Sequence, residues 1–284
     1  MLNKIKNHLR HIFGEVELKQ LTGGYTNGVF LIEGTNPAMV AKISDQQNND
    51  GLNEYNSLYL LKNNNCAPNI YDVFEVDNSR ILLIDYLPGV NAQSILDEGD
   101  TKKAEKVYEL LGKELAIKIH NIKYQETTTN LPIIKRHSGD YFKLDFIPRS
   151  LTVEAERILK DKGSDEDNVL IHGDYGPHNA LLDNDTIHII DWEWAGWGSP
   201  IQDVSWIIWF LKLHYPDRAQ SLFLAFLNTY RKHSEIFITS ELVRTYAISR
   251  VMNVLNKINN ENTEVKKEWI RRLNWTLETD FSIN

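Results

Sequence analysis

The sequence predicts an α+β protein of two lobes, a small antiparallel-sheet lobe over residues 1–87 and a larger, mostly helical lobe over residues 88–284. Two observations lead to this prediction. In the first third of the chain, short apolar runs alternate with turns rich in glycine, asparagine and proline, which is typical of antiparallel hairpins. Beyond Pro88 and Gly89, apolar residues recur at three- and four-residue spacing over long segments, which indicates amphipathic helices.

Each lobe has an expected order of elements. The first lobe should begin with a short helix that ends near Gly14, followed by five strands with one helix inserted after the third. The strands are predicted at residues 15–21, 29–33, 38–43, 70–76 and 80–85, and the inserted helix at 51–61. In the second lobe, helices are predicted at 104–119, 204–214, 219–231, 240–258 and 266–276. Short β-branched or aliphatic runs at 169–171, 180–182 and 186–190 interrupt the helices, and 124–136 is expected to be an irregular connection.

Composition excludes several classes of protein. With 284 residues, of which 42% are hydrophobic and 25% charged, the chain can bury a core and is not expected to be disordered. Its net charge of -8 argues against a nucleic-acid partner, because binding phosphates requires a surplus of lysine and arginine. A single cysteine, Cys66, and the lack of a signal-peptide core or a membrane-length apolar run predict a cytoplasmic protein with no membrane partner. The oligomeric state stays open.

The segment with the most chemical content is HGDYGPHN at residues 172–179, which is followed by a strand ending at Asp191. Phosphoryl transfer to a hydroxyl group requires a carboxylate beside the acceptor and oxygen ligands for magnesium, held a few ångströms apart. Asp174 is the candidate proton acceptor. Asn179 and Asp191 are the candidate metal ligands, because a neutral amide beside an ionised carboxylate suits a hard cation that also binds phosphate oxygens and water.

In the order of these motifs the sequence resembles the aminoglycoside phosphotransferase and choline kinase superfamily, which has a protein-kinase-like fold. HGD at 172–174 with Asn179 resembles its catalytic loop, and IDWE at 190–193 resembles its metal-binding strand end. The resemblance implies a small-molecule kinase with ATP as the phosphoryl donor, GTP being left open, and Mg²⁺ as the cofactor. It also implies that Asp174 is the catalytic base and that Asn179 and Asp191 hold the metal.

Three upstream features resemble the nucleotide-binding parts of the same superfamily, in the expected order. The turn TGGYTNG resembles the loop over the ATP phosphates, with candidate contacts at Gly23, Gly24, Thr26, Asn27 and Gly28. Lys42, on the third strand, resembles the lysine that neutralises the α- and β-phosphates, and Glu54 on the next helix is placed to pair with it. Tyr86 and Leu87 resemble the hinge whose backbone groups bind adenine.

The acceptor is expected to be a small molecule, because the next apolar helix begins about eleven residues after Asp191 and leaves little room for a protein-docking activation segment. Glu193 and Trp194, with Trp192 and Trp197 nearby, are candidate substrate contacts. They favour an amine-bearing acceptor, such as an aminoglycoside or a related antibiotic, through charge pairing and cation–π attraction. A choline- or ethanolamine-type metabolite is the alternative. The plainer interpretation of each tryptophan is packing.

A catalytically silent nucleotide-binding protein is an alternative from another class. Taken alone, Lys42 and Glu54 would be an ordinary strand-to-helix ion pair, and the glycine-rich turn an ordinary hairpin. The presence of Lys42 together with Asp174, Asn179 and Asp191 argues against a silent protein.

A zinc hydrolase is a further alternative, since His172, His178 and the two aspartates at 174 and 191 are residue types that bind zinc. That interpretation leaves the upstream nucleotide-binding features unexplained. We therefore interpret His172 as a residue that organises its loop, and Asp203 as a helix cap or a brace for that loop.

Overall fold

The computed structural model describes residues 2–21, 28–47, 49–125, 131–133, 144–160 and 168–283. Within these residues the chain forms two compact units. The first unit is drawn from residues 1–99, 126–132 and 177–195, and the second from residues 100–125, 133–176 and 196–284. The lobe boundary predicted after residue 87 stays a prediction.

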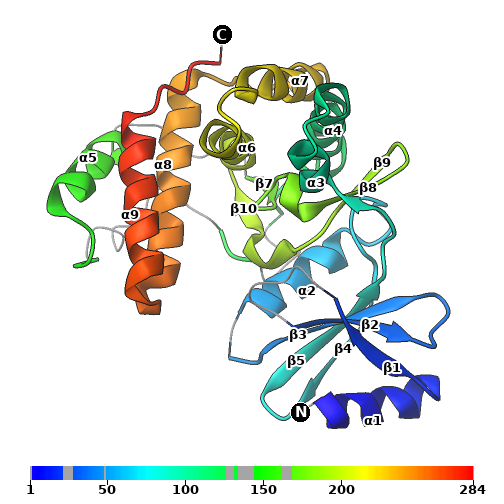
Figure 1. Ribbon diagram of the computed structural model, residues 1–284. Helices are drawn as coiled ribbons and strands as arrows, with labels where there is room; N and C mark the ends of the chain where they lie inside the picture. Colours follow the sequence, from blue (N-terminus) through cyan, green and yellow to red (C-terminus); the bar gives the residue numbers. More distant parts are fainter. Residues whose placement is uncertain are drawn as a thin grey trace. The chain divides into compact units, whose positions relative to one another are not determined.

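A five-stranded antiparallel sheet and two helices make up most of the first unit (Figure 1). The helices are α1 (Leu2–Phe13), which precedes the strands, and α2 (Asp50–Leu60), which follows the third strand. The strands are β1 (Glu17–Gln20), β2 (Gly28–Glu33), β3 (Met39–Asp45), β4 (Ile70–Val76) and β5 (Ser79–Asp85). They lie in the order β1-β2-β3-β5-β4. The α+β prediction is confirmed here, and the predicted elements lie within about two residues of their expected bounds.

The sheet buries different side chains on its two faces. Ala41 and Ile43 on β3 belong to a hydrophobic core that includes Ile5 and Leu9 of α1. Because successive strand residues point to opposite faces, Lys42 points away from this core. Helix α2 contacts β3, β4 and β5 and supplies an ion-pair partner to Lys42, so α2 covers the other face.

A second, smaller sheet in the first unit joins β6 (Val90–Asn91), β8 (Ala180–Asp183) and β9 (Thr186–Ile189) in the order β6-β8-β9. The remaining short elements here are α3 (Ala92–Asp97) and the single turns η3 (Pro177–Asn179) and η4 (Trp192–Trp194). Gly89 precedes β6 with φ of +127°, and a Cβ there would lie 2.7 Å from the carbonyl oxygen of Leu182. Glycine is therefore required where the chain passes from β5 to β6.

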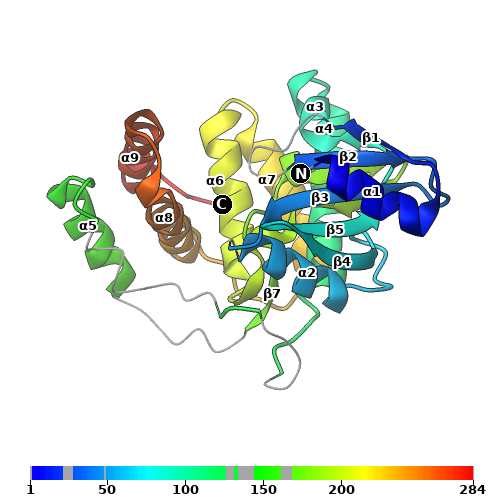
Figure 2. The same ribbon diagram turned by 90° about the horizontal axis from the view of Figure 1, so that it is seen from below.

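The second unit is mostly helical. Its elements are α4 (Thr101–Glu114), the π-helical turn η1 (Leu115–Ile119), α5 (Arg149–Lys160), α6 (Ile201–His214), α7 (Ala219–Lys232), α8 (Ser240–Lys257), η5 (Ile258–Asn260) and α9 (Thr263–Glu278). The strand β7 (Val169–Ile171) pairs antiparallel with β10 (Gly196–Gly198). Helix α4 packs on α7, α6 on α7 and α8, and α8 on α9, with α8 and α9 side by side in both views (Figures 1 and 2).

Helix α6 is the most deeply buried helix of those described, since every residue from Ile201 to Leu211 is buried. A helix that is apolar around its whole circumference must be enclosed by other elements. Asp203, in its first turn, is a charged exception with 0% of its surface exposed. Because a buried charge without partners is costly, the carboxylate of Asp203 requires hydrogen-bond donors around it.

Some elements differ from the sequence prediction. The helix predicted at 104–119 is α-helical to Glu114 and then π-helical, and α6 begins three residues earlier than predicted, at Ile201. The elements α3, α5, β6 and β10 were not predicted, and most of the connection at 124–136 lies outside the described residues. Among the described residues, no helix combines the length and apolar character needed to cross a membrane.

Candidate functional site

Lys42, Glu54 and Asp191 form a charged cluster in the first unit. The Nζ of Lys42 lies 2.7 Å from Oε2 of Glu54 on α2, and it donates a hydrogen bond of 2.5 Å to Oδ1 of Asp191. Lys42 and Glu54 are almost fully buried, whereas 37% of the Asp191 side chain is exposed. The predicted pairing of Lys42 with Glu54 is confirmed, and Asp191, 149 residues away along the chain, joins it.

The electrostatics of this cluster keep Lys42 charged. Burial by itself lowers the pKa of Lys42, but the negative charges of Glu54 and Asp191 outweigh burial and raise that pKa above its ordinary value. Burial also raises the pKa of the Glu54 carboxyl, and the Lys42 ammonium opposes that rise. The result is a fixed positive charge next to a partly exposed carboxylate.

The β8–β9 hairpin places Asn179 close to Asp191. Ala180 at the start of β8 pairs with Ile189 at the end of β9, and the N–H of Ile190 donates to the carbonyl oxygen of Asn179 over 2.9 Å. Asp191 follows directly, with φ of 66° and ψ of 64° in the left-handed region. The two candidate metal ligands therefore leave the same end of one hairpin.

These two residues fit a magnesium ion. An amide and a carboxylate offer hard oxygen ligands, and Mg²⁺ commonly takes one or two protein ligands and completes its shell with phosphate oxygens and water. Among the residues that the structure describes, no group of three or more histidine, cysteine, aspartate or glutamate side chains is arranged to hold a metal. In addition, the Nδ1 of His172 accepts the backbone N–H of Asp174 at 3.2 Å. The hydrogen bond of His172 to its own loop weighs against the zinc-hydrolase alternative.

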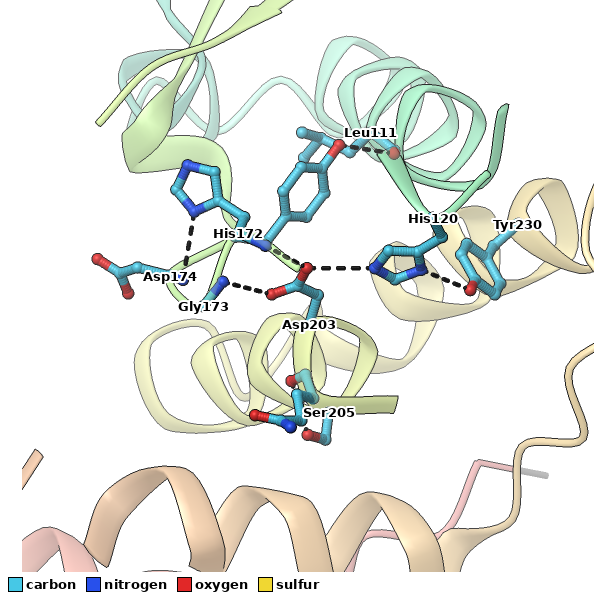
Figure 3. A network of polar contacts seen from close by, with 10 residues as sticks. Leu111, His120, His172, Gly173, Asp174, Asp203, Ser205 and Tyr230 are labelled. Carbon is cyan, nitrogen blue, oxygen red and sulfur yellow. Dashed lines mark hydrogen bonds and ion pairs between the residues drawn. The ribbon is translucent and has the colours of Figure 1, made fainter. Parts of the chain in front are cut away.

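In the second unit, Asp203 holds the loop that precedes Asp174 (Figure 3). The backbone N–H groups of His172 and Gly173 donate to its two carboxylate oxygens, each over 2.8 Å. Gly173 has a φ of 77°, a backbone conformation that a glycine adopts without strain. Asp203 is thus the brace that the sequence suggested, and it anchors the loop at two successive residues.

His120 is the third partner of Asp203. Its Nε2 lies 3.2 Å from Oδ2 of Asp203, and its Nδ1 lies 2.8 Å from the hydroxyl of Tyr230 (Figure 3). Burial lowers the pKa of His120, although the Asp203 carboxylate opposes this. The imidazole is therefore neutral near pH 7, so Nε2–H donates to Asp203 and Nδ1 accepts the hydroxyl proton of Tyr230.

Asp174 lies on this braced loop with its carboxylate pointing away from Asp203 (Figure 3). The next residue, Tyr175, is fully buried and its hydroxyl donates to the carbonyl oxygen of Leu111 over 2.9 Å. The Nε1–H of Trp206 on α6 donates to Oδ1 of Asp174 over 2.7 Å. Sequence reasoning missed Trp206. Its position one helical turn after Asp203 was the available signal.

The nucleotide-binding candidates are described only in part. Gly23, Gly24, Thr26 and Asn27 lie outside the described residues. Gly28 opens β2, where a Cβ would come 2.9 Å from the ring of Phe30. At the predicted hinge, the N–H of Tyr86 donates to the carbonyl oxygen of Ala38 over 3.0 Å. That N–H is therefore already engaged by a backbone partner, and the adenine contacts at Tyr86 and Leu87 stay a prediction.

The predicted substrate contacts are less open than expected. Glu193 has 6% of its surface exposed, and its carbonyl oxygen accepts a 3.4 Å hydrogen bond from the side chain of Asn53. Trp194 is partly buried. Trp192 and Trp197 are buried at 0% and 1% exposure, so these two tryptophans pack inside their units. Of the four, Trp194 has the most surface available to a ligand.

The chain matches the model of a known protein family. The family model described as "Phosphotransferase enzyme family" matches residues 17–236, which is well over half of the chain. The matched range contains all the candidate residues of both units. No curated protein matches the chain by sequence.

Solved structures support the fold. An aminoglycoside phosphotransferase APH(4)-Ia, in a ternary complex with ADP and hygromycin B, has a TM-score of 0.70 and 16% identity, covering 96% of this chain and 98% of its own. An amicoumacin kinase in complex with AMP-PNP, Ca²⁺ and Ami has a TM-score of 0.70 and 13% identity, covering 99% of this chain and 98% of its own. A putative fructosamine-3-kinase from Haemophilus somnus gives 0.66 and 16%, covering 98% of each chain. At these identities the likeness shows the kinase-like fold.

Proposed function

The chain belongs to the phosphotransferase enzyme family, and from that premise we propose that it transfers the γ-phosphoryl group of ATP to a hydroxyl group of an amine-bearing small molecule. Membership of the family makes it a small-molecule phosphotransferase. The observation that supports the proposed catalytic residues most directly is the contact of Lys42 with Glu54 and Asp191, at 2.7 and 2.5 Å. In a kinase-like site, this arrangement places a fixed cation beside the carboxylate that is expected to bind the metal.

In the proposed reaction, a small set of side chains has separate roles. Asp174 accepts the proton of the acceptor hydroxyl, the hydroxyl oxygen bonds to the γ-phosphorus, and the bond from that phosphorus to the leaving ADP breaks. Lys42 neutralises the α- and β-phosphates, and Asn179 with Asp191 holds Mg²⁺. When bound, the ion supplies positive charge to the phosphate oxygens as negative charge develops on them.

Three observations favour an amine-bearing acceptor. The chain has a net charge of -8, which attracts cations. Glu193 and the partly buried Trp194 lie two and three residues after Asp191, so a carboxylate and an aromatic ring are close in sequence to the proposed metal ligand. Hygromycin B and amicoumacin are present in structures of similar fold. An aminoglycoside or a related antibiotic is therefore the first acceptor class to test, with choline and ethanolamine as the second.

A substrate panel tests this function. The purified protein is incubated with ATP or GTP and Mg²⁺, together with aminoglycosides, choline, ethanolamine, amino-sugars, nucleosides or macrolides, and ADP or GDP formation is measured. We expect acceptor-dependent release of ADP that requires Mg²⁺ and stops when EDTA is added. The substitution Asp174→Asn keeps the size of the side chain and removes the proton acceptor, so it should abolish turnover. Turnover retained in Asp174→Asn would exclude this residue as the base, and phosphorylation of a protein but of no small molecule would exclude the proposed acceptor class.

A further inference from the structure

Two side chains that the sequence did not single out approach the carboxylate of Asp174. Trp206 donates its Nε1–H to Oδ1 of Asp174 over 2.7 Å. A terminal guanidinium nitrogen of Arg250, on α8, lies 4.0 Å from the same oxygen. All three residues belong to the second unit, and the two contacts converge on one of the two carboxylate oxygens.

The indole ring of Trp206 is fixed by its surroundings. It stacks on Trp209, with ring centres 4.3 Å apart and planes at 7°, and the guanidinium carbon of Arg250 lies 5.2 Å from its ring centre. Only 5% of Trp206 is exposed, which leaves almost no surface for stacking on a bound ligand. The geometry therefore favours a role toward Asp174 over a role in contacting the acceptor.

A hydrogen bond from a fixed donor determines how a carboxylate is oriented. The bond from Trp206 to ionised Asp174 is charge-assisted and short, and it occupies Oδ1. Because proton transfer requires the base within hydrogen-bond reach and in the right orientation, a carboxylate free to rotate would spend less time in the reactive arrangement.

We propose that Trp206, supported by Arg250, is a positioning residue that fixes the orientation in which the carboxylate of Asp174 meets the acceptor hydroxyl. The inference rests on the phosphotransferase function proposed above. Trp206 forms and breaks no bond in the reaction. The Asp174 carboxylate takes the hydroxyl proton while the hydroxyl oxygen bonds to the γ-phosphorus and ADP leaves, and Trp206 acts only through the orientation of Asp174.

The chain provides a matched pair of tryptophans for the test. Trp209 lies one turn further along α6, and its Nε1–H donates to the hydroxyl of Thr276 over 2.8 Å and not to a carboxylate. The substitutions Trp206→Phe and Trp209→Phe each keep an aromatic ring and remove one N–H donor. With the acceptor found in the substrate panel, Trp206→Phe should lower kcat about tenfold or more while the KM values for ATP and acceptor stay within about twofold. Trp209→Phe should leave kcat nearly unchanged.

Crystal structures of the two variants test the positioning without any acceptor. Asp174 should keep its orientation in Trp209→Phe and should turn to another orientation in Trp206→Phe. An unchanged Asp174 in Trp206→Phe, an equal fall of kcat in both variants, or a raised acceptor KM at constant kcat would overturn the proposal. If the wild-type protein phosphorylates nothing in the panel, the proposed function fails, and the two crystal structures still decide whether Trp206 orients Asp174.

Discussion

Lys42 shows how two carboxylates can retain a charge inside a protein. Its side chain points to the α2 face of the sheet, where Glu54 has only 2% of its surface exposed. The attraction within such a buried ion pair is offset by the cost of removing two charges from water. The presence of the pair therefore does not by itself show that it stabilises the fold. Removal of one partner is different, because an uncompensated buried charge remains.

The substitution Lys42→Met should therefore destabilise the protein by about 3–5 kcal/mol at pH 7. Burial raises the pKa of Glu54, and a carboxyl with a raised pKa favours the folded state at low pH and loses that contribution as pH rises through its folded value. The difference in free energy of unfolding between wild type and Lys42→Met should therefore shrink as pH is lowered from about 7 toward about 5. Urea unfolding of both proteins at the two pH values measures it.

A lysine of the same sheet provides the control. Lys19 on β1 has 66% of its side chain exposed and lies 3.9 Å from Glu33, so Lys19→Met should change stability little at either pH. In the wild type, the raised pKa of Lys42 acts in the same direction at higher pH: its stabilising charge is present below the ordinary lysine pKa of 10.5 and is lost as pH rises through the higher folded value. Equal stability of the two variants at pH 7 would contradict the buried ion pair.

At the scale of elements, α6 supports the loop that carries Asp174. Asp203 in its first turn binds two backbone N–H groups of the loop, and Trp206 in the next turn binds the carboxylate of Asp174 itself. The π-helical turn η1 ends α4 with the N–H of His120 bonded to the carbonyl oxygen of Leu115 over 2.8 Å. His120 then joins Asp203 to Tyr230 on α7, so three helices contribute to one polar network.

Removal of the Tyr230 hydroxyl tests this network. Tyr230→Phe leaves Nδ1 of buried His120 without a donor, which should cost about 1–3 kcal/mol of unfolding free energy. Tyr108→Phe is the matched control, because Tyr108 is also fully buried but its hydroxyl has no hydrogen-bond partner in the part of the chain that is described. The control should be neutral or slightly stabilising. Similar losses in both variants, measured by urea unfolding, would show that the Tyr230–His120 bond contributes nothing specific.

The order of elements and part of the site could be predicted from the sequence for a physical reason. In long amphipathic helices and turn-bounded strands the apolar residues recur at a regular spacing. This spacing predicts the main helices and the strands of the sheet. A two-residue strand such as β6 or a six-residue helix such as α3 is too short to show a period. The pairing of Lys42 with Glu54 could be predicted because strand and helix follow one another directly along the chain.

The support of Asp174 could not be predicted in the same way. Trp206 and Arg250 are 32 and 76 residues further along the chain than Asp174, and both lie in helices whose apolar pattern indicates burial alone. Which atom an indole N–H meets depends on how α6, α8 and the loop pack together. A tryptophan in a buried helix is therefore ambiguous in the sequence and becomes specific only in three dimensions.

At the scale of the whole molecule, the candidate residues divide between the two units. Lys42, Glu54, Asn179 and Asp191, proposed to bind phosphates and metal, belong to the first unit, and Asp174 belongs to the second. Nucleotide binding and proton acceptance should therefore be separable by substitution.

Thermal unfolding with a non-hydrolysable ATP analogue and Mg²⁺ tests the separation. A ligand at about 100 times its Kd stabilises the folded protein by about 2.7 kcal/mol, which corresponds to a Tm increase of several degrees for a chain of this size. Wild type and Asp174→Asn should both show the increase, because the base does not hold the nucleotide. Lys42→Met should lose most of it, since the cation for the α- and β-phosphates is gone, and Lys19→Met should keep it. An increase that disappears in Asp174→Asn but persists in Lys42→Met would reverse the roles proposed for these two residues.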